Sequence, residues 1–130
     1  MSDMSSYLKV KLLNLTLNGT SYAGMDDPYV SLHTADPTDA GTGTEVSGTG
    51  YARVQAEFNT ATGTDASETT SSDTTWAAAG ASWGTVGWIG LWDASTSGNM
   101  IYHTALDAAK TIDTGDVFKI TAGNLTVTLA

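Results

Sequence analysis

Cysteine is absent from this 130-residue sequence, and basic residues are scarce. Without cysteine, the chain has no disulfides, thiol catalysis or zinc–thiolate sites. Its 5 basic residues stand against 14 acidic ones, which gives a formal net charge of −9. Binding to a nucleic-acid backbone needs clustered Lys and Arg, so the composition argues against DNA or RNA as a partner.

Long apolar runs are also missing. No stretch approaches the roughly 20 residues that cross a bilayer. The start, MSDMSSYLKV, lacks the basic stretch followed by an apolar stretch that marks a secretion signal. We therefore expect a soluble protein with no membrane partner, made in the cytoplasm. A chain of this length forms one domain, which buries roughly 65 to 70% of its unfolded surface and needs no metal or disulfide.

The most informative stretch runs from Trp83 to Leu106 and contains three of the four tryptophans. From position 86 the residues alternate with the period of a strand, which places Val86, Trp88, Gly90 and Trp92 on one face. Turn formers occupy 93–99, and β-branched and aromatic residues return over 100–106. The stretch therefore predicts an antiparallel hairpin with one aromatic face.

The first element has two interpretations. Ser5 or Ser6 can cap a helix that ends before Gly19, with apolar positions at i, i+4 and i+7, namely Leu8, Leu12 and Leu15. A strand is the rival, because apolar residues alternate with lysines over 8–12. Since this alternation breaks at Leu12-Leu13, we favour a short amphipathic helix whose leucine face covers one end of a sheet.

Further strands are expected along the chain. Residues 29–34 alternate with Val30 and Leu32 inward, and Pro37 ends that strand. Residues 51–58 carry a charged face that is either exposed to solvent or paired with a neighbouring segment. The other expected strands are 68–75, 110–112, 117–120 and 125–129.

Short strands with frequent turns indicate a mainly β fold, an antiparallel β-sandwich or Greek-key-like single domain with one short N-terminal helix. We place the helix and its connector at 1–27 and the sandwich at 28–130. The loop over 35–50 should lie at the surface. Residues 59–75 are low in complexity and apolar content, and whether they form a contact arm stays open.

Candidate chemistry is sparse. Residues 80–84 match G-x-S-x-G around Ser82, but a strand follows where the nucleophile elbow needs a helix. His33 and His103 stand alone in expected strands, with no carboxylate at matching spacing. No glycine loop with a lysine is present to hold a phosphate. We therefore predict no catalytic residue and no cofactor.

A calcium site is the remaining candidate. Its ligands would be carboxylates of the acidic loop, namely Asp36, Asp39 and Glu45, with Asp26 and Asp27 as further candidates. Their spacing does not follow the known calcium-loop pattern. We favour solvated turn acids and predict no metal.

The aromatic residues can form either a core or a binding platform. Flat tryptophan rings can line a carbohydrate site, but in a small β domain they usually pack inside. We assign eight residues to the core or to a subunit interface: Trp83, Trp88, Trp92, Tyr102, Phe118, Tyr51, Val30 and Leu32. Because only four lysines are available to guard strand edges, self-association or docking is the hypothesis that the composition supports best.

A series of short motifs covers nearly the whole chain: Tyr29–Pro37, Asp39, Gly41, Glu45–Gly48, Tyr51–Arg53, Trp83–Val86, Gly90–Ala94, Gly98–Tyr102, Lys110–Ile112, Gly115–Asp116 and Ala122–Leu129. In this order the motifs resemble those of a widespread family of small tailed-bacteriophage virion proteins. Family members are usually labelled tail fibre or minor tail proteins. The chain departs from them at Lys9–Lys11, which is less helix-like than the usual start.

The resemblance implies a non-enzymatic virion structural protein, made in the host cytoplasm, whose partners are viral structural proteins. A chain with a radius of gyration of roughly 14 Å forms a knob without a shaft. We therefore expect a capsid decoration or cement protein that binds the outer shell and contacts the major capsid protein. The alternative is a minor tail or tail-fibre-tip component that contacts the host surface. In either place we expect a homo-oligomer, for example a trimer.

Overall fold

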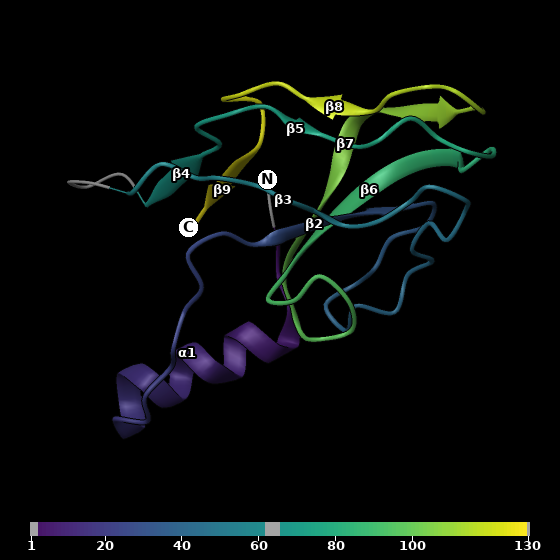
Figure 1. Ribbon diagram of the computed structural model, residues 1–130. Helices are drawn as coiled ribbons and strands as arrows, with labels where there is room; N and C mark the ends of the chain where they lie inside the picture. Colours follow the sequence, from purple (N-terminus) through teal and green to yellow (C-terminus); the bar gives the residue numbers. More distant parts are fainter. Residues whose placement is uncertain (1–2, 62–65, 130) are drawn as a thin grey trace.

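A five-stranded antiparallel sheet with strand order β1-β7-β6-β2-β3 forms the larger layer of the fold (Figure 1). The computed structural model describes residues 3–61 and 66–129. In chain order the sheet strands are β1 Asp3–Met4, β2 Tyr29–His33, β3 Val54–Gln55, β6 Gly84–Trp92 and β7 Met100–Ile112. Two short pairs, β4–β9 and β5–β8, lie along one side of this sheet. Their strands are β4 Ser67–Thr69, β5 Thr74–Thr75, β8 Lys119–Ile120 and β9 Thr126–Thr128.

The hydrophobic core joins the sheet to the two short pairs. Val30 and Leu32 of β2 are fully buried in the same cluster as Trp76 and Phe118. The rings of Trp76 and Phe118 meet edge to face, with centroids 5.2 Å apart. This packing confirms the expected mainly β, antiparallel domain with one helix, in a β-sandwich arrangement.

The predicted hairpin is confirmed as β6 and β7. Leu91 pairs with Tyr102 near the turn, and Gly84 pairs with Ile112 at the far end, so β7 runs beyond the expected end at Leu106. Over Trp88–Trp92 the faces alternate as expected, because these residues pair with β2 without a shift, although the register against β7 shifts between Val86 and Trp88 and again before Trp92. Burial does not follow the alternation: Ile89 to Trp92 are all buried, so both faces of this part of β6 are covered, while Trp88 is only half-buried.

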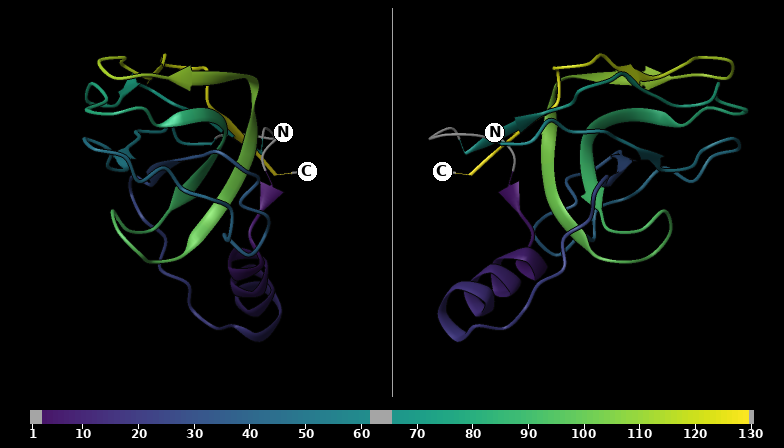
Figure 2. Two further views of the ribbon diagram at one scale, coloured as in Figure 1. Left: turned by 90° about the vertical axis from the view of Figure 1, so that its right-hand side faces the viewer. Right: turned by 60° about the vertical axis from the view of Figure 1, so that its left-hand side comes forward.

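Helix α1 spans Ser6–Asn18, so the helix interpretation is confirmed and the strand alternative is wrong. The Ser5 hydroxyl accepts the N–H of Leu8, and Gly19 ends the helix with φ 64°, which a residue without Cβ adopts freely. The helix projects away from the sheet (Figure 2). Its leucine face covers the sheet only at its first turns, because Leu8 is buried but Leu15 is 41% exposed.

In the part of the chain that the structure describes, no helix is long and apolar enough to cross a membrane.

Three expected strands are wrong in extent. Only Val54–Gln55 of the segment 51–58 pairs as β3, and only Lys119–Ile120 of the segment 117–120 pairs as β8. The expected strand 68–75 is two strands, β4 and β5, separated by a bend at which the Ser71 N–H bonds the Glu57 carbonyl at 2.8 Å. Residues 62–65, in the middle of the candidate contact arm 59–75, lie outside the described residues.

Candidate functional site

Strand β2 is buried on both faces. Besides Val30 and Leu32, the polar side chains of Ser31 and His33 are 0% and 1% exposed. The loop that was expected at the surface folds partly over this strand: the Val46 N–H bonds the Leu32 carbonyl at 2.9 Å, and Val46 itself is buried. That loop helps to cover the second face of β2. Residues on both faces of the strand are therefore buried, and not only every second residue.

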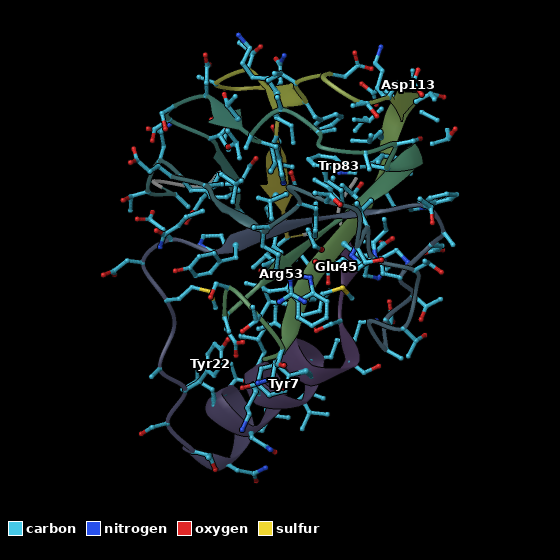
Figure 3. All side chains as sticks on the ribbon, turned by 45° about the vertical axis from the view of Figure 1, so that its right-hand side comes forward. Tyr7, Tyr22, Glu45, Arg53, Trp83 and Asp113 are labelled. Atoms are coloured by element: carbon cyan, nitrogen blue, oxygen red, sulfur yellow. The ribbon has the colours of Figure 1, made fainter. Side chains whose placement is uncertain are left out.

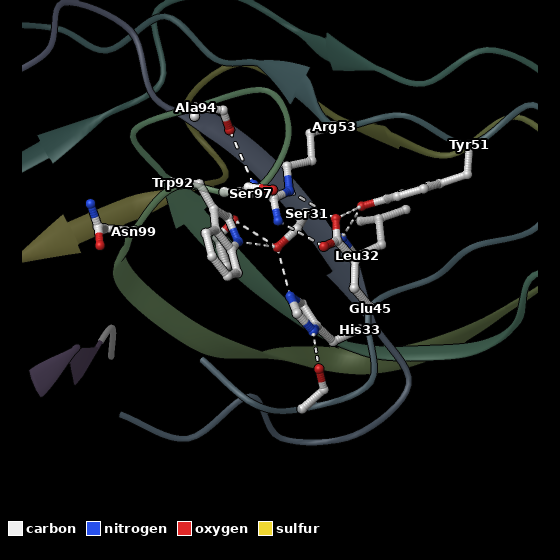
Figure 4. A network of polar contacts seen from close by, with 12 residues as sticks. Ser31, Leu32, His33, Glu45, Tyr51, Arg53, Trp92, Ala94, Ser97 and Asn99 are labelled. Carbon is white, nitrogen blue, oxygen red and sulfur yellow. Dashed lines mark hydrogen bonds and ion pairs between the residues drawn. The ribbon is translucent and has the colours of Figure 1, made fainter. Parts of the chain in front are cut away.

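The buried polar groups of β2 form a chain of hydrogen bonds with one defined proton arrangement (Figure 4). The His33 Nδ1 lies 3.2 Å from the Gly43 carbonyl, which can only accept, so Nδ1 carries the proton. The free His33 Nε2 accepts from the Ser31 hydroxyl at 2.6 Å. The Trp92 Nε1–H donates to the same hydroxyl at 2.7 Å. Burial lowers the pKa of His33, which keeps this neutral tautomer in place.

A glycine in β6 makes room for these bonds. A Cβ at Gly90 would lie 2.8 Å from the Ser31 Oγ and 3.0 Å from the Trp92 Nε1. Any side chain at this position would therefore separate the two partners.

Beside this chain lies a charged pair, Glu45 and Arg53 (Figures 3 and 4). The Arg53 Nη2 and Nε donate to the two Glu45 oxygens at 2.8 and 2.9 Å, and the Tyr51 hydroxyl donates to Glu45 at 2.7 Å. Burial raises the pKa of Glu45, but the hydrogen bonds from Arg53 and Tyr51 outweigh burial and leave it below its usual value. Burial and the bond to Glu45 raise the pKa of Tyr51 far above its usual value.

The Arg53 guanidinium also binds the turn of the β6–β7 hairpin. It lies 3.9 Å from the centroid of the Trp92 ring, and its Nη1 donates to the carbonyls of Ala94 and Ser97 at 3.1 and 2.8 Å. The Arg53 side chain is only 7% exposed. The sequence pattern placed Arg53 on a charged strand face without naming its partner, because a pairing with Glu45 and with a turn 41 residues away leaves no local signal.

A second polar cluster attaches α1 to the sheet. Asp39 forms an ion pair with Lys9 of the helix and a hydrogen bond with His103 of β7, whose Nε2 lies 2.8 Å from the Asp39 Oδ1. Asp36 lies 3.8 Å from the other ring nitrogen of His103. The hydrogen bonds from Lys9 and then from His103 lower the pKa of Asp39. We call Lys9, Asp39 and His103 the helix clip.

The candidate residues for catalysis and for calcium binding do not come together in one site. Asp36 and Asp39 face His103, whereas Glu45 faces Arg53. Within 3–61 and 66–129, no group of three or more His, Asp or Glu side chains is arranged to hold a metal. Ser82 contacts backbone groups, the Ile112 carbonyl and the Gly84 N–H, and strand β6 follows it.

The residues predicted for the core or an interface differ in burial. Trp83, Trp92, Phe118, Val30 and Leu32 are buried. Tyr51, Trp88 and Tyr102 are half-buried. Tyr51 packs edge to face on Trp83, with centroids 5.5 Å apart. A contact of any of these side chains with another subunit stays a prediction.

Helix α1 displays an apolar surface that the sequence interpretation missed. Val10, Leu13 and Leu17 are 56%, 57% and 75% exposed. Their spacing of i, i+3 and i+7 places them on one face, opposite Leu8 and Leu12. We call these three residues the α1 stripe. The spacing was available in the sequence, but the leucines on the other face provided an equally regular pattern.

An apolar cavity of about 310 Å³ lies on the other side of the helix. It is lined by Leu8 and Leu12 of α1 and by side chains of the connector, β7 and the β4–β9 region, among them Met25, Phe58, Tyr102, Val127 and Leu129. The charged residues in its lining are both acidic, Asp26 and Glu68. We call this the α1 cavity.

Comparison with protein families gives a match over nearly the whole chain. Residues 3–128 match the family described as podophage GP4 fiber I protein gp80. Among curated proteins, none matches the chain. The family match spans both polar clusters, the α1 stripe and, apart from Leu129, the lining of the α1 cavity.

Proposed function

Because the chain belongs to the podophage GP4 fiber I protein gp80 family and is a structural protein of a tailed-phage virion, we propose that it is a subunit of a phage fibre. The observation that carries this proposal is the extent of the match, which includes nearly every described residue. It favours the tail-fibre alternative over capsid decoration, for which no comparison gives support.

The protein works through contacts with other virion proteins and not through catalysis. The polar groups with unusual surroundings have partners within the chain: His33 bonds Ser31, and Arg53 bonds Glu45. They fix the hairpin turn and the loop over β2. A body fixed in this way presents surface features, such as α1, in one orientation to a neighbouring subunit.

Labelling of intact virions tests the proposal. We expect gold-conjugated antibody against the purified chain to mark fibres in electron micrographs, and we expect isolated tails with fibres to contain the protein after removal of heads. Label spread over the capsid shell, together with a rise in shell melting temperature when purified protein is added, would support decoration and overturn the fibre assignment. A preparation of virions stripped of fibres serves as the control.

A further inference from the structure

The apolar side chains that α1 leaves in water are concentrated on one element. Among described residues, four of the six exposed large hydrophobic side chains belong to this helix, and three of them form the α1 stripe. The opposite face of the helix already contacts the body through Leu8 and lines the α1 cavity through Leu8 and Leu12. A helix that is apolar on two faces is normally covered on both. The stripe is therefore suited to contact another chain.

The charge of the chain indicates what covers the stripe. Residues 4–25, which include α1, contain Lys9 and Lys11 and no acidic residue, whereas the rest of the chain carries all 14 acidic residues and three basic ones. Lys9 is already paired with Asp39, so Lys11 is the cation that α1 can offer to a second copy. Two copies that met helix to helix would bring the two Lys11 side chains together, whereas a helix that met the acidic body of another copy would gain attraction between opposite charges.

The α1 cavity has the complementary properties. It is concave and mainly apolar, and its charged lining residues are Asp26 and Glu68 without a described basic residue. The stripe faces away from the cavity of its own chain, because Leu8 and Leu12 lie on the cavity side. One copy can therefore present its stripe outward and keep its cavity open.

We propose that the α1 stripe of one copy docks into the α1 cavity of a second copy. This inference rests on the proposed function, since it describes how a compact fibre subunit joins its neighbour. The contact is head to tail, with different surfaces on the two partners, and such contacts repeat to form a ring or a filament. Tyr22 lines the cavity and Tyr7 lies nearby on the helix, at the end of the molecule away from Asp113 (Figure 3).

Sedimentation velocity on the full chain over a range of concentrations tests the proposal. We expect the unchanged protein to associate. Leu13→Glu with Leu17→Glu removes the stripe, and Leu129→Lys or, separately, Asp26→Lys changes the cavity. Each should weaken association by roughly tenfold or more. Val117→Glu changes an exposed apolar residue elsewhere, 58% exposed, and should leave association unchanged. Circular dichroism confirms that each variant is folded.

Mixing the variants tests the head-to-tail arrangement. The stripe variant retains an intact cavity and the cavity variant retains an intact stripe, so the mixture should form one-to-one pairs that do not grow further. Failure of the mixture to pair would overturn the arrangement, as would pairing by the stripe variant alone. A parent chain that stays monomeric at all concentrations would overturn the inference.

The docking inference and the proposed fibre function can fail independently of each other. If virion labelling marks fibres while the purified chain never associates, the fibre assignment stands and the docking inference fails. If the chain associates as described but labels only capsids, the docking inference stands and the fibre assignment fails.

Discussion

The β2–β6 interface and helix α1 distribute polarity in opposite ways. At the interface Ser31 and His33 are buried, whereas on the helix Leu13 and Leu17 lie in water. The buried hydroxyl and imidazole each have a hydrogen-bond partner, so burial costs little and fixes a single packing. The exposed leucines have no such compensation within the chain. The comparison indicates that the interface stabilises one subunit, whereas the helix carries the surface that we propose for contact between subunits.

The largest effect on stability is expected at Trp92. Trp92→Ala should lower the free energy of unfolding by about 4 kcal/mol, because the ring is buried, bonds Ser31 and stacks on Arg53. Denaturant unfolding measures the loss. Trp92→Phe is the control, since it retains a buried ring and removes the N–H. A Trp92→Ala protein as stable as the parent and defective only in assembly would place the ring in an interface.

Breaking the charged pair should cost somewhat less. Arg53→Ala leaves the half-buried Glu45 without its cation and frees the hairpin turn, and we expect a loss of about 3 kcal/mol. The double variant Glu45→Gln with Arg53→Met removes both charges and should recover part of that loss. If the double variant is no more stable than Arg53→Ala, the unpaired Glu45 carboxylate does not cause the loss of stability in Arg53→Ala.

Acid should weaken the interface through His33. Its pKa in the folded protein is lowered, so as pH falls through about 6.5 the unfolded chain takes up a proton before the folded one does. The stability present above that pH is lost as pH falls towards the folded pKa. Denaturant midpoints between pH 7 and 5 should decline in the parent and decline less in His33→Gln. Equal slopes in the two proteins would assign the decline to other groups.

The lowered pKa of Glu45 acts at lower pH. Its stabilising contribution is present above the unfolded carboxylate pKa of about 4.3 and is lost as pH falls through the folded value. The two groups therefore weaken the same region in two separate windows of pH.

The smallest effect is expected on the exposed side of α1. Leu17→Ala should change the free energy of unfolding by no more than about 0.5 kcal/mol, because that side chain is 75% exposed. Leu8→Ala, in the same helix but 4% exposed, should cost about 3 kcal/mol. Thermal or denaturant unfolding of the two variants compares them directly. Similar losses in both would mean that Leu17 packs within the chain.

The elements with a strong local signal could be predicted. The cap at Ser5 and the stop at Gly19 are short-range hydrogen-bonding and steric effects, so the sequence indicates α1 correctly. The hairpin of β6 and β7 follows from alternation around a turn. Trp88 is only half-buried although it shares the predicted face with the buried Trp92, and no local pattern indicates which part of that face is covered.

The polar clusters could not be predicted, because each depends on segments distant in sequence. Ser31 and Trp92 are 61 residues apart, and Asp39 and His103 are 64 apart. From sequence alone, polar residues in a strand are predicted to face the solvent. Only the three-dimensional structure shows that a loop covers them. The same limit applies to the end of the segment 51–58, where tertiary contacts and not alternation decide which residues pair.

The contacts that attach α1 to the sheet also determine how a mechanical load on the helix reaches the rest of the subunit. Between β1 and the helix, Ser5 donates its N–H to the Ile101 carbonyl and its hydroxyl to the Met100 carbonyl, and the helix clip adds Lys9 and His103 through Asp39. A force applied to the helix by a neighbouring chain passes into the first residues of β7, the longest strand in the described structure. Under such a load, the hydrogen bonds of Ser5 and the helix clip are the contacts that transmit tension from the helix to the hairpin.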